Sequence, residues 1–334
     1  MSMGSQRSVG MKLHRCLGEV GPELALAIGN FDGMHRGHQA ILQATVDASV
    51  RKDLVSAALT FHPLPREFFA GVRGDASLAP PRLMSTTEKL AAFCRAGIDH
   101  AFVPIFDAQF AAQTPDDFVG QLAAMKVRWL MVGEDFRFGA RRAGDVSALR
   151  AAGMHHGFSV ETMADIVDEA GGTSLRVSST AVREALAAGE LGVAARMLGR
   201  RYAIIGRVTH GKKLGRSLGF PTANVSLTGR KPALSGVFAV KLWLVTRGLE
   251  GVASKAGDTL LGVANLGTNP AVVNDGRHHL EVFLFDYSGD LYGKRVEVEF
   301  IEKVRDEQNF ASLDALVVQM HDDCNEAKRI LRGI

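Results

Sequence analysis

Residues 29–38 read Gly-Asn-Phe-Asp-Gly-Met-His-Arg-Gly-His and directly follow five consecutive apolar residues, Leu24 to Ile28. So short an apolar run predicts a buried strand, and the helical spacing of apolar residues over 39–50 predicts a helix after it. The glycines therefore lie in a strand-to-helix turn. At such a turn backbone N–H groups and the positive end of the helix dipole face outward, and glycine lets a polyphosphate approach the backbone. His35 and His38 can hydrogen-bond one anion together, so the turn is predicted to bind a nucleotide.

Strands and helices alternate through the rest of the first half. Apolar runs over 54–61, 100–105 and 128–132 predict further strands. Capping residues at 85–88 and the sequence Thr114-Pro115 predict helix starts between them. This alternation predicts a parallel sheet wrapped by helices, that is, a Rossmann-like α/β domain.

The pattern changes after residue 201. Strand-like segments follow one another with turns and no helices between them, at 202–208, 237–245, 260–266, 280–285 and 296–301. Consecutive strands predict an antiparallel sheet or a small β-barrel. Ser312 then starts a long amphipathic helix with an apolar stripe from Leu313 to Leu331, which is expected to pack on the barrel. We expect domains at 12–188 and 202–334, joined by a linker at 189–201.

Composition limits the classes of function. The 334 residues carry a net charge of only +3 with both signs interspersed, which argues against a nucleic-acid surface, whereas small anions such as ATP suit local basic loops. The cysteines, Cys16, Cys94 and Cys324, are too scattered for a disulfide framework or a zinc site. No segment approaches the roughly twenty apolar residues that cross a bilayer. These features predict a cytoplasmic protein whose metal ions, if present, bind to oxygen atoms.

The turn at 29–38 also carries a recognisable motif. His35-Arg36-Gly37-His38 is the HxGH pattern, and together with Gly29 to Gly33 it resembles the FMN adenylyltransferase module of bacterial bifunctional riboflavin kinase/FAD synthetases. HxGH alone is common to a whole nucleotidyltransferase superfamily, so by itself it indicates a chemistry rather than a substrate. The structural alternative is a tight turn with two exposed histidines.

Three further segments of the first half resemble motifs of the same family. They are Phe61-x-Pro63-x-Pro65, the segment 133–139 (Gly-Glu-Asp-Phe-Arg-Phe-Gly), and the segment 178–183 (Ser-Ser-Thr-Ala-Val-Arg). Each has a structural alternative: prolines that end a strand, core phenylalanines beside a solvated arginine, and a helix cap. The resemblance assigns to nucleotide and flavin the residues Gly29, Asn30, Phe31, Asp32, Gly33, Phe61, Pro63, Pro65, Gly133, Asp135, Phe136, Arg137, Ser178, Ser179, Thr180 and Arg183.

The reaction that the resemblance implies joins the phosphate of FMN to the α-phosphorus of ATP and expels pyrophosphate. The FMN phosphate is already anionic near neutral pH, so no strong base is needed, and catalysis consists of alignment and charge stabilisation. His35, His38 and Arg183 are assigned to the triphosphate, and Asp135 to orientation.

The second half carries the segment 215–224, Gly-Arg-Ser-Leu-Gly-Phe-Pro-Thr-Ala-Asn, which resembles the riboflavin kinase signature GRxLGFPTAN. A near match to a phosphate-binding loop at 206–212 fails because Lys213 replaces the required serine or threonine and no helix follows. Thr222 and Asn224 are two oxygen donors on one face of an extended segment, which suits Mg²⁺. The alternative is a glycine-rich hairpin with a basic rim. The residues expected to contact phosphates or flavin are Gly211, Lys212, Lys213, Gly215, Arg216, Gly219, Phe220 and Pro221.

Two later segments complete the resemblance. Residues 262–270 resemble the family's GVANxGxxP and include Asn265, although Ala271 stands where the family commonly has threonine. Glu281 lies in a segment that resembles the strand of the catalytic glutamate. Because it alternates with Val282 and Leu284, it is expected on the opposite face, pointing into the barrel mouth as the base for the riboflavin 5′-hydroxyl. The alternative is an exposed strand glutamate.

The resemblance spans most of the chain and implies a bifunctional enzyme. Its substrates would be riboflavin, FMN and ATP, with Mg²⁺ as cofactor and neither nucleic acid nor membrane as a partner. A cytidylyltransferase-like enzyme whose barrel only binds substrate is the enzymatic alternative. A flavin- or RNA-binding module that kept the fold is the non-enzymatic one, but such a module should lack Thr222, Asn224 and Glu281.

Overall fold

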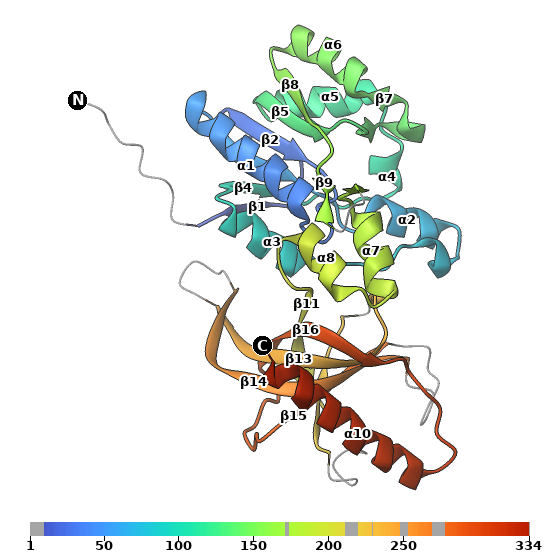
Figure 1. Ribbon diagram of the computed structural model, residues 1–334. Helices are drawn as coiled ribbons and strands as arrows, with labels where there is room; N and C mark the ends of the chain where they lie inside the picture. The colour runs from blue at the N-terminus through green and yellow to red at the C-terminus, as the bar shows by residue number, and fades with distance from the viewer. Residues whose placement is uncertain are drawn as a thin grey trace, which may run out of the picture. The chain divides into compact units, whose positions relative to one another are not determined.

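In the computed structural model, residues 10–170, 174–210, 220–228, 230–247, 253–268 and 278–333 are described (Figure 1). Contacts divide the chain into two compact units. The first comprises the chain up to Pro80 and Thr86–Val177, and the second comprises Pro81–Ser85 and most of the chain from Ser178 onward. The domain limits expected from sequence, 12–188 and 202–334, stay a prediction. Within the described ranges, none of the helices combines the length and hydrophobicity that a bilayer crossing requires.

The first unit is built on a six-stranded sheet in which every neighbouring pair is parallel. The expected Rossmann-like sheet is thus confirmed. Its order is β1 (Lys12–His14), β4 (His100–Phe102), β3 (Val55–Leu59), β2 (Leu24–Ile28), β5 (Val127–Gly133) and β8 (Ser159–Met163). The two edge strands, β1 and β8, were not expected from the sequence. Their residues are mostly exposed or half-buried, so neither carries the apolar run that reveals a central strand.

Helices cover both faces of this sheet. The helices of the first unit are α1 (Arg36–Arg51), α2 (Pro65–Val72), α3 (Thr86–Arg95), α4 (Ala108–Ala111), α5 (Pro115–Ala124) and α6 (Val146–His156). Short elements complete it: η1 (Ala76–Leu78), η2 (Ala140–Arg142), and the ribbons of β6 (Arg137–Phe138) with β7 (Gly144–Asp145) and of β9 (Val167–Asp168) with β10 (Leu175–Arg176). The expected helix start at Thr114 is confirmed as a capping box with Asp117, and Pro115 is the first helical residue.

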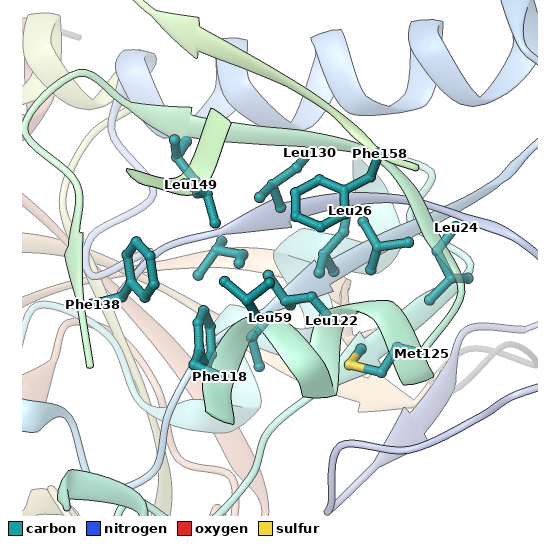
Figure 2. Close-up of a cluster of buried hydrophobic side chains, with 14 of the residues drawn as sticks. Leu24, Leu26, Leu59, Phe118, Leu122, Met125, Leu130, Phe138, Leu149 and Phe158 are labelled. Atoms are coloured by element: carbon teal, nitrogen blue, oxygen red, sulfur yellow. The ribbon is translucent and has the colours of Figure 1, made fainter. Parts of the chain in front are cut away.

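Strand β2 shows how the sequence pattern builds the core. Leu24, Leu26 and Ile28 join a cluster of buried side chains with residues of α5 and α6 (Figure 2). Ala25 and Ala27 are equally buried on the other face, and α1 contacts this strand. Large side chains on one face and alanines on the other let a helix pack against each, which explains why the strand reads as unbroken apolar sequence.

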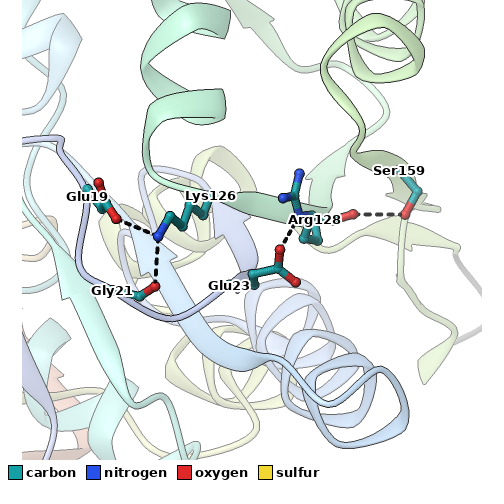
Figure 3. A network of polar contacts seen from close by, with 6 residues as sticks. All are labelled: Glu19, Gly21, Glu23, Lys126, Arg128 and Ser159. Carbon is teal, nitrogen blue, oxygen red and sulfur yellow. Dashed lines mark hydrogen bonds and ion pairs between the residues drawn. The ribbon is translucent and has the colours of Figure 1, made fainter.

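A polar network lies at the end of the sheet where strands β2 and β5 begin (Figure 3). Lys126 Nζ lies 2.5 Å from Glu19 and donates to the Gly21 carbonyl at 3.3 Å. Arg128 Nε pairs with Glu23 at 2.7 Å. All these ion-paired side chains are largely exposed, so each contributes at most about 1 kcal/mol of stability.

Two histidines pack at the β1 edge of the sheet. The ring of His14 stacks on His100, with 5.0 Å between centroids, and on Phe102 at 4.6 Å. His14 Nε2 and His100 Nδ1 are buried without a hydrogen-bond partner among the described residues. Burial lowers the pKa of both imidazoles, and the charge of Lys12 lowers both further, while Asp99 partly offsets this for His100.

This pair makes stability depend on pH. Because both pKa values are lower in the folded state than the ordinary 6.5, the unfolded state binds protons more readily. The pair's stabilisation is complete above 6.5 and is lost as pH falls below it. We expect the free energy of unfolding to fall between pH 7.5 and 5.5, measured by urea denaturation, and to fall less in the His14→Phe/His100→Phe variant. An identical pH dependence in the two proteins would contradict this assignment.

The core of the second unit is a closed barrel in which neighbouring strands are antiparallel, as expected. Its order is β11 (Ala203–Thr209), β12 (Thr222–Val225), β15 (His279–Leu284), β14 (Ala253–Gly267), β13 (Gly236–Arg247) and β16 (Arg295–Arg305). Alternate residues of these strands fill the interior and are almost fully buried, among them Ile204, Phe238, Val282 and Val298. Helices α7 (Ser179–Ala187) and α8 (Leu191–Leu198) belong to the same unit.

The C-terminal helix α10 (Leu313–Arg332) begins after its cap Ser312 and packs on the outside of the barrel. Only the second half of the predicted apolar stripe is buried: Ala327 and Leu331 pack near Ala239 and Ile301, whereas Leu313 is 58% exposed. The barrel offers an apolar outer patch to just that half of the helix, which the helix sequence alone could not reveal.

A buried ion pair fixes α10 at its middle. Arg305 Nε and Nη2 each donate to Asp323 at 2.7 Å, and Gln319 donates to the same carboxylate at 3.0 Å. Burial, aided by the charge of Asp323, raises the pKa of the neighbouring Cys324 thiol to about 11. The thiol is therefore protonated at neutral pH, in keeping with a packing role.

Candidate active sites

The HxGH residues form the start of α1. The helix begins at Arg36, three residues before the apolar spacing indicated, because His35 is its N-cap and accepts the backbone N–H of His38 on Nδ1 at 3.4 Å. The two imidazole rings stack, with centroids 3.7 Å apart and planes inclined by 22°. No acidic residue occupies the first turn. The histidine pair, the helix N-terminus and the absence of nearby acids in that turn together favour an anion.

The turn before this helix is strained and tightly packed. Phe31 and Met34 have φ near +47°, a region that large side chains rarely adopt. The Phe31 ring is fully buried and meets His38 and Phe93 edge-on, at 5.3 and 5.1 Å. A Cβ at Gly29 would lie 3.2 Å from that ring, so any larger residue would force the buried ring to shift. Phe31 and the 2%-exposed Asp32 therefore shape the turn from inside the protein.

The Phe-x-Pro-x-Pro segment leads into an aromatic cluster. Phe61 lies 5.7 Å from Phe106, which also contacts Phe68 and Phe69 of α2, while Pro65 is the first residue of that helix. Phe69 is 47% exposed. The rings meet edge-on, and of the four only Phe69 is exposed, so the cluster is a half-buried apolar group that includes the predicted flavin residue Phe61. The sequence analysis missed α2 and these additional phenylalanines, although the pair Phe68-Phe69 just after the prolines was a visible signal.

Segment 133–139 is divided between core and surface. Phe138 joins the buried cluster of the sheet, and Phe136 is partly buried and stacks on it at 5.8 Å. Arg137 and Asp135 are exposed. Asp135 forms an ion pair with Arg176 at 3.3 Å. Arg176 was not recognised from the sequence, because it lies 41 residues from Asp135 and follows no motif.

Segment 178–183 begins α7 in the second unit. Ser178 is the N-cap and accepts the Ala181 N–H at 3.1 Å, as the capping alternative predicted. Arg183 Nε donates to the Pro81 carbonyl at 2.6 Å. The assignment of Ser178, Ser179, Thr180 and Arg183 to ATP phosphates stays a prediction.

The predicted kinase site is partly described. Gly211, Lys212, Lys213, Gly215, Arg216, Gly219 and Ala271 lie outside the described residues. The described part contains three neighbouring strands, β12, β15 and β14. Glu281 of β15 stands opposite Asn224 of β12 on one side and opposite Asn265 of β14 on the other. Directly paired residues point to the same face of a sheet with Cβ atoms about 5 Å apart, so these three side chains form one row.

The register corrects the expected direction of Glu281. Its neighbours Leu280, Val282 and Leu284 are the buried ones that fill the barrel, so Glu281 points to the outer face and not into the barrel mouth. Its position on the face opposite Val282 and Leu284 is as expected. The physical reason is that, among the described strand residues, apolar side chains fill the small barrel, which leaves the outside as the place for a carboxylate.

Further groups lie along this outer face. Thr222 is paired with Phe283 and is half-buried on the same side as Asn224. Phe220 packs against Phe283 at 5.2 Å and against His321 of α10 at 4.9 Å. His321 was not assigned to this region from sequence. Among the residues that the structure describes, no cluster of three or more His, Cys, Asp and Glu side chains could hold a metal ion.

Comparisons with known proteins agree with this two-part arrangement. Residues 19–181 match the FAD synthetase family and residues 198–331 match the riboflavin kinase family. A bifunctional riboflavin kinase/FMN adenylyltransferase of Escherichia coli K12 is 43% identical over 89% of this chain and 90% of its own. The bifunctional riboflavin kinase/FMN adenylyltransferase of Haemophilus influenzae is 42% identical, and the match covers 91% of this chain and 93% of that protein.

A solved structure has the same architecture. It is described as a macrolide-efflux protein of Streptococcus pneumoniae, is 26% identical, covers 96% of this chain and 99% of its own, and superposes with a TM-score of 0.74. The identity to full-length relatives and the order of the two matched families agree with the two units, and the chain therefore belongs to the bifunctional riboflavin kinase/FMN adenylyltransferase family.

Proposed function

We propose that the chain has two activities. It phosphorylates riboflavin with ATP to give FMN at the row formed by Asn224, Glu281 and Asn265 on the barrel. It then adenylylates FMN with a second ATP to give FAD at the turn that carries His35 and His38. Family membership supports both activities. The observation that carries the assignment of the kinase is the register, which sets Glu281 between Asn224 and Asn265. We also propose that the working domains are 12–188 and 202–334, joined by 189–201.

In the kinase reaction, Glu281 accepts the proton of the riboflavin 5′-hydroxyl. The hydroxyl oxygen forms a bond to the γ-phosphorus of ATP, the bond from that phosphorus to the bridging oxygen breaks, and ADP leaves. Asn265, directly opposite Glu281, is placed to orient the carboxylate or the substrate. Phe220, which is 5% exposed and packs between Phe283 and His321, supports this face from beneath.

The donor set on this face fits Mg²⁺. Thr222 and Asn224 offer a hydroxyl and an amide oxygen on one face of β12, and Mg²⁺ takes such hard ligands together with phosphate oxygens and water. Thr222 and Asn224 would therefore hold the ion. When bound, it neutralises charge on the ATP phosphates. A carboxylate cage is not required, because the nucleotide itself contributes anionic ligands.

In the adenylyl transfer, a phosphate oxygen of FMN forms a bond to the α-phosphorus of ATP, and the bond to the β-phosphate oxygen breaks to release pyrophosphate. His35 and His38, stacked at the start of α1, hydrogen-bond the triphosphate and stabilise its charge. The aromatic cluster of half-buried Phe61 and Phe106 with exposed Phe69 offers ring edges and one open face to the flavin ring. Asp135 orients the substrates.

A time course tests the function. Purified protein with riboflavin, ATP and Mg²⁺ should form FMN first and FAD later, with one ATP consumed for each step, and chromatography separates the flavins. If riboflavin alone caused no ATP consumption but added FMN were adenylylated, the barrel would only bind its ligand. Flavin binding without any turnover would favour the non-enzymatic module. A cytoplasmic location is proposed from the dependence on ATP and the three free cysteines.

The same assay tests the metal site. Excess EDTA should stop FMN formation, and added Mg²⁺ should restore it. Replacing Asn224 by leucine removes one proposed ligand, so half-maximal kinase activity should need about tenfold more Mg²⁺, equivalent to about 1.4 kcal/mol of lost binding. The control variant Thr209→Val changes a side chain that donates to the Asn224 backbone carbonyl and leaves the Asn224 side chain in place. An unchanged Mg²⁺ requirement in Asn224→Leu would reject the residue as a ligand.

A further inference from the structure

A buried lysine lies behind the nucleotide-binding turn. Lys89 of α3 is 3% exposed, and its Nζ donates to the Asn30 backbone carbonyl at 2.6 Å and to Thr60 Oγ1 at 3.0 Å. Thr60 Oγ1 in turn donates to the same Asn30 carbonyl at 3.1 Å. The ammonium, the hydroxyl and the carbonyl thus close a triangle. Asn30 immediately precedes Phe31, where the backbone takes its strained φ of +47°.

The same helix supports the turn at a second point. Phe93 lies four residues after Lys89, on the same face of α3, and its ring meets the Phe31 ring edge-on at 5.1 Å. Phe31 then contacts His38 at 5.3 Å, and His38 stacks on His35. Contacts therefore run without a break from α3 through the turn to the histidine pair.

Burying a cation costs free energy even when it is paired, and an apolar side chain could hold α3 on the sheet at lower cost. A strained backbone persists only where its surroundings fix it. An ammonium on the carbonyl before Phe31 does fix it, because it restrains the peptide plane that leads into the strained residue. The cost of burying the Lys89 ammonium therefore falls at the turn that positions the rings of His35 and His38.

We propose that Lys89 is a positioning residue for FAD formation, which holds the 30–34 turn so that His35 and His38 present their rings to the triphosphate. This inference rests on the proposed adenylyltransferase function. Lys89 itself does not contact substrate, and its effect passes through Asn30, Phe31 and His38. A displacement of about 1 Å at a reacting group can lower the rate of a step about 100-fold.

The test uses the full-length protein and both of its activities. Lys89→Met keeps an unbranched side chain only one atom shorter and removes the ammonium. We expect kcat for conversion of FMN to FAD to fall by about 10- to 100-fold with KM for FMN changed less than about threefold, while riboflavin kinase activity is retained. The matched control is Lys126→Met. Lys126 also donates to a backbone carbonyl, that of Gly21, but at the far end of the strands, so both activities should remain unchanged.

A milder variant separates positioning from stability. Thr60→Val removes the hydroxyl that links the ammonium to the carbonyl and should lower the same kcat by a smaller factor. The double variant Lys89→Met/Thr60→Val should lose less than the product of the single factors, because both act on one carbonyl. Thermal melts accompany each assay.

The outcomes are distinct. Wild-type kcat in Lys89→Met would overturn the inference. It would also be overturned if Lys89→Met lost FAD formation only together with its melting transition, while Thr60→Val kept wild-type kcat and stability. If the wild-type protein formed no FAD from FMN and ATP, the proposed function itself would fail, which the reference reaction reveals before any variant is compared.

Discussion

Replacing His38 by alanine should abolish FAD formation while FMN continues to form from riboflavin. The ring of His38 stacks on His35 at the first turn of α1, so its loss removes one imidazole from the triphosphate and the packing partner of the other. Loss of one group that stabilises charge in a transfer reaction lowers kcat by about 100- to 1,000-fold. The measurement is the rate of FAD formation from added FMN and ATP, with the kinase rate determined on the same sample.

The matched control is His156→Ala. His156 is an exposed histidine at the end of α6, so its loss should change neither rate. Retained kinase activity in His38→Ala would show that the second unit is folded, and an unchanged thermal melt would show the same for the first. Normal FAD synthesis by this variant would refute the assignment of the histidine pair to the triphosphate.

Glu281→Gln should have the opposite pattern: FMN production collapses, but added FMN still becomes FAD. The substitution keeps the size of the side chain between Asn224 and Asn265 and removes its ability to accept a proton. General base catalysis contributes about 100- to 10,000-fold, so the kinase rate should fall by that order. Riboflavin and ATP are supplied for one rate, and FMN and ATP for the other.

Glu297→Gln is the control for a strand glutamate in general. Glu297 of β16 pairs with Lys255 at 3.1 Å and has no proposed part in the reaction, so both rates should stay within about twofold of wild type. If Glu281→Gln lost both activities together, the two reactions would not be independent. Unchanged FMN production would leave Glu281 as an ordinary strand residue of the barrel.

Local patterns were sufficient for the elements at the centre of each unit. Strand β2 and the turn after it were recognised because five apolar residues, glycines and a histidine pair are adjacent in sequence. Five of the six barrel strands were expected, but the added hairpin loop expected at 251–258 is wrong from Ala253 onward, where β14 already begins, and β12 was expected only as an extended segment. The edge strands β1 and β8 and helix α2 were missed, because half-exposed elements carry weak periodicity.

The candidate sites were predictable as residue types and less so as geometry. The sequence places Thr222, Asn224 and Glu281 in strands, but the direction of Glu281 depends on which alternate residues fill the barrel. Lys89 and Arg176 carry no motif. Each meets its partner across dozens of residues, Lys89 at Asn30 and Arg176 at Asp135. Such pairs arise only when the sheet brings separate segments together.

The sequence by itself determined the chemistry that is available: an anion-binding turn with two histidines, oxygen donors two residues apart, and a glutamate on a strand. These depend on neighbours along the chain, whose spacing fixes which side chains share a face. Only the tertiary structure decided that Glu281 faces outward between Asn224 and Asn265, and that a buried ammonium on α3 restrains the Asn30 carbonyl. Strand register and helix packing set those contacts. Both depend on which apolar surfaces of the whole chain are buried against each other, and the spacing of residues within one segment does not encode that.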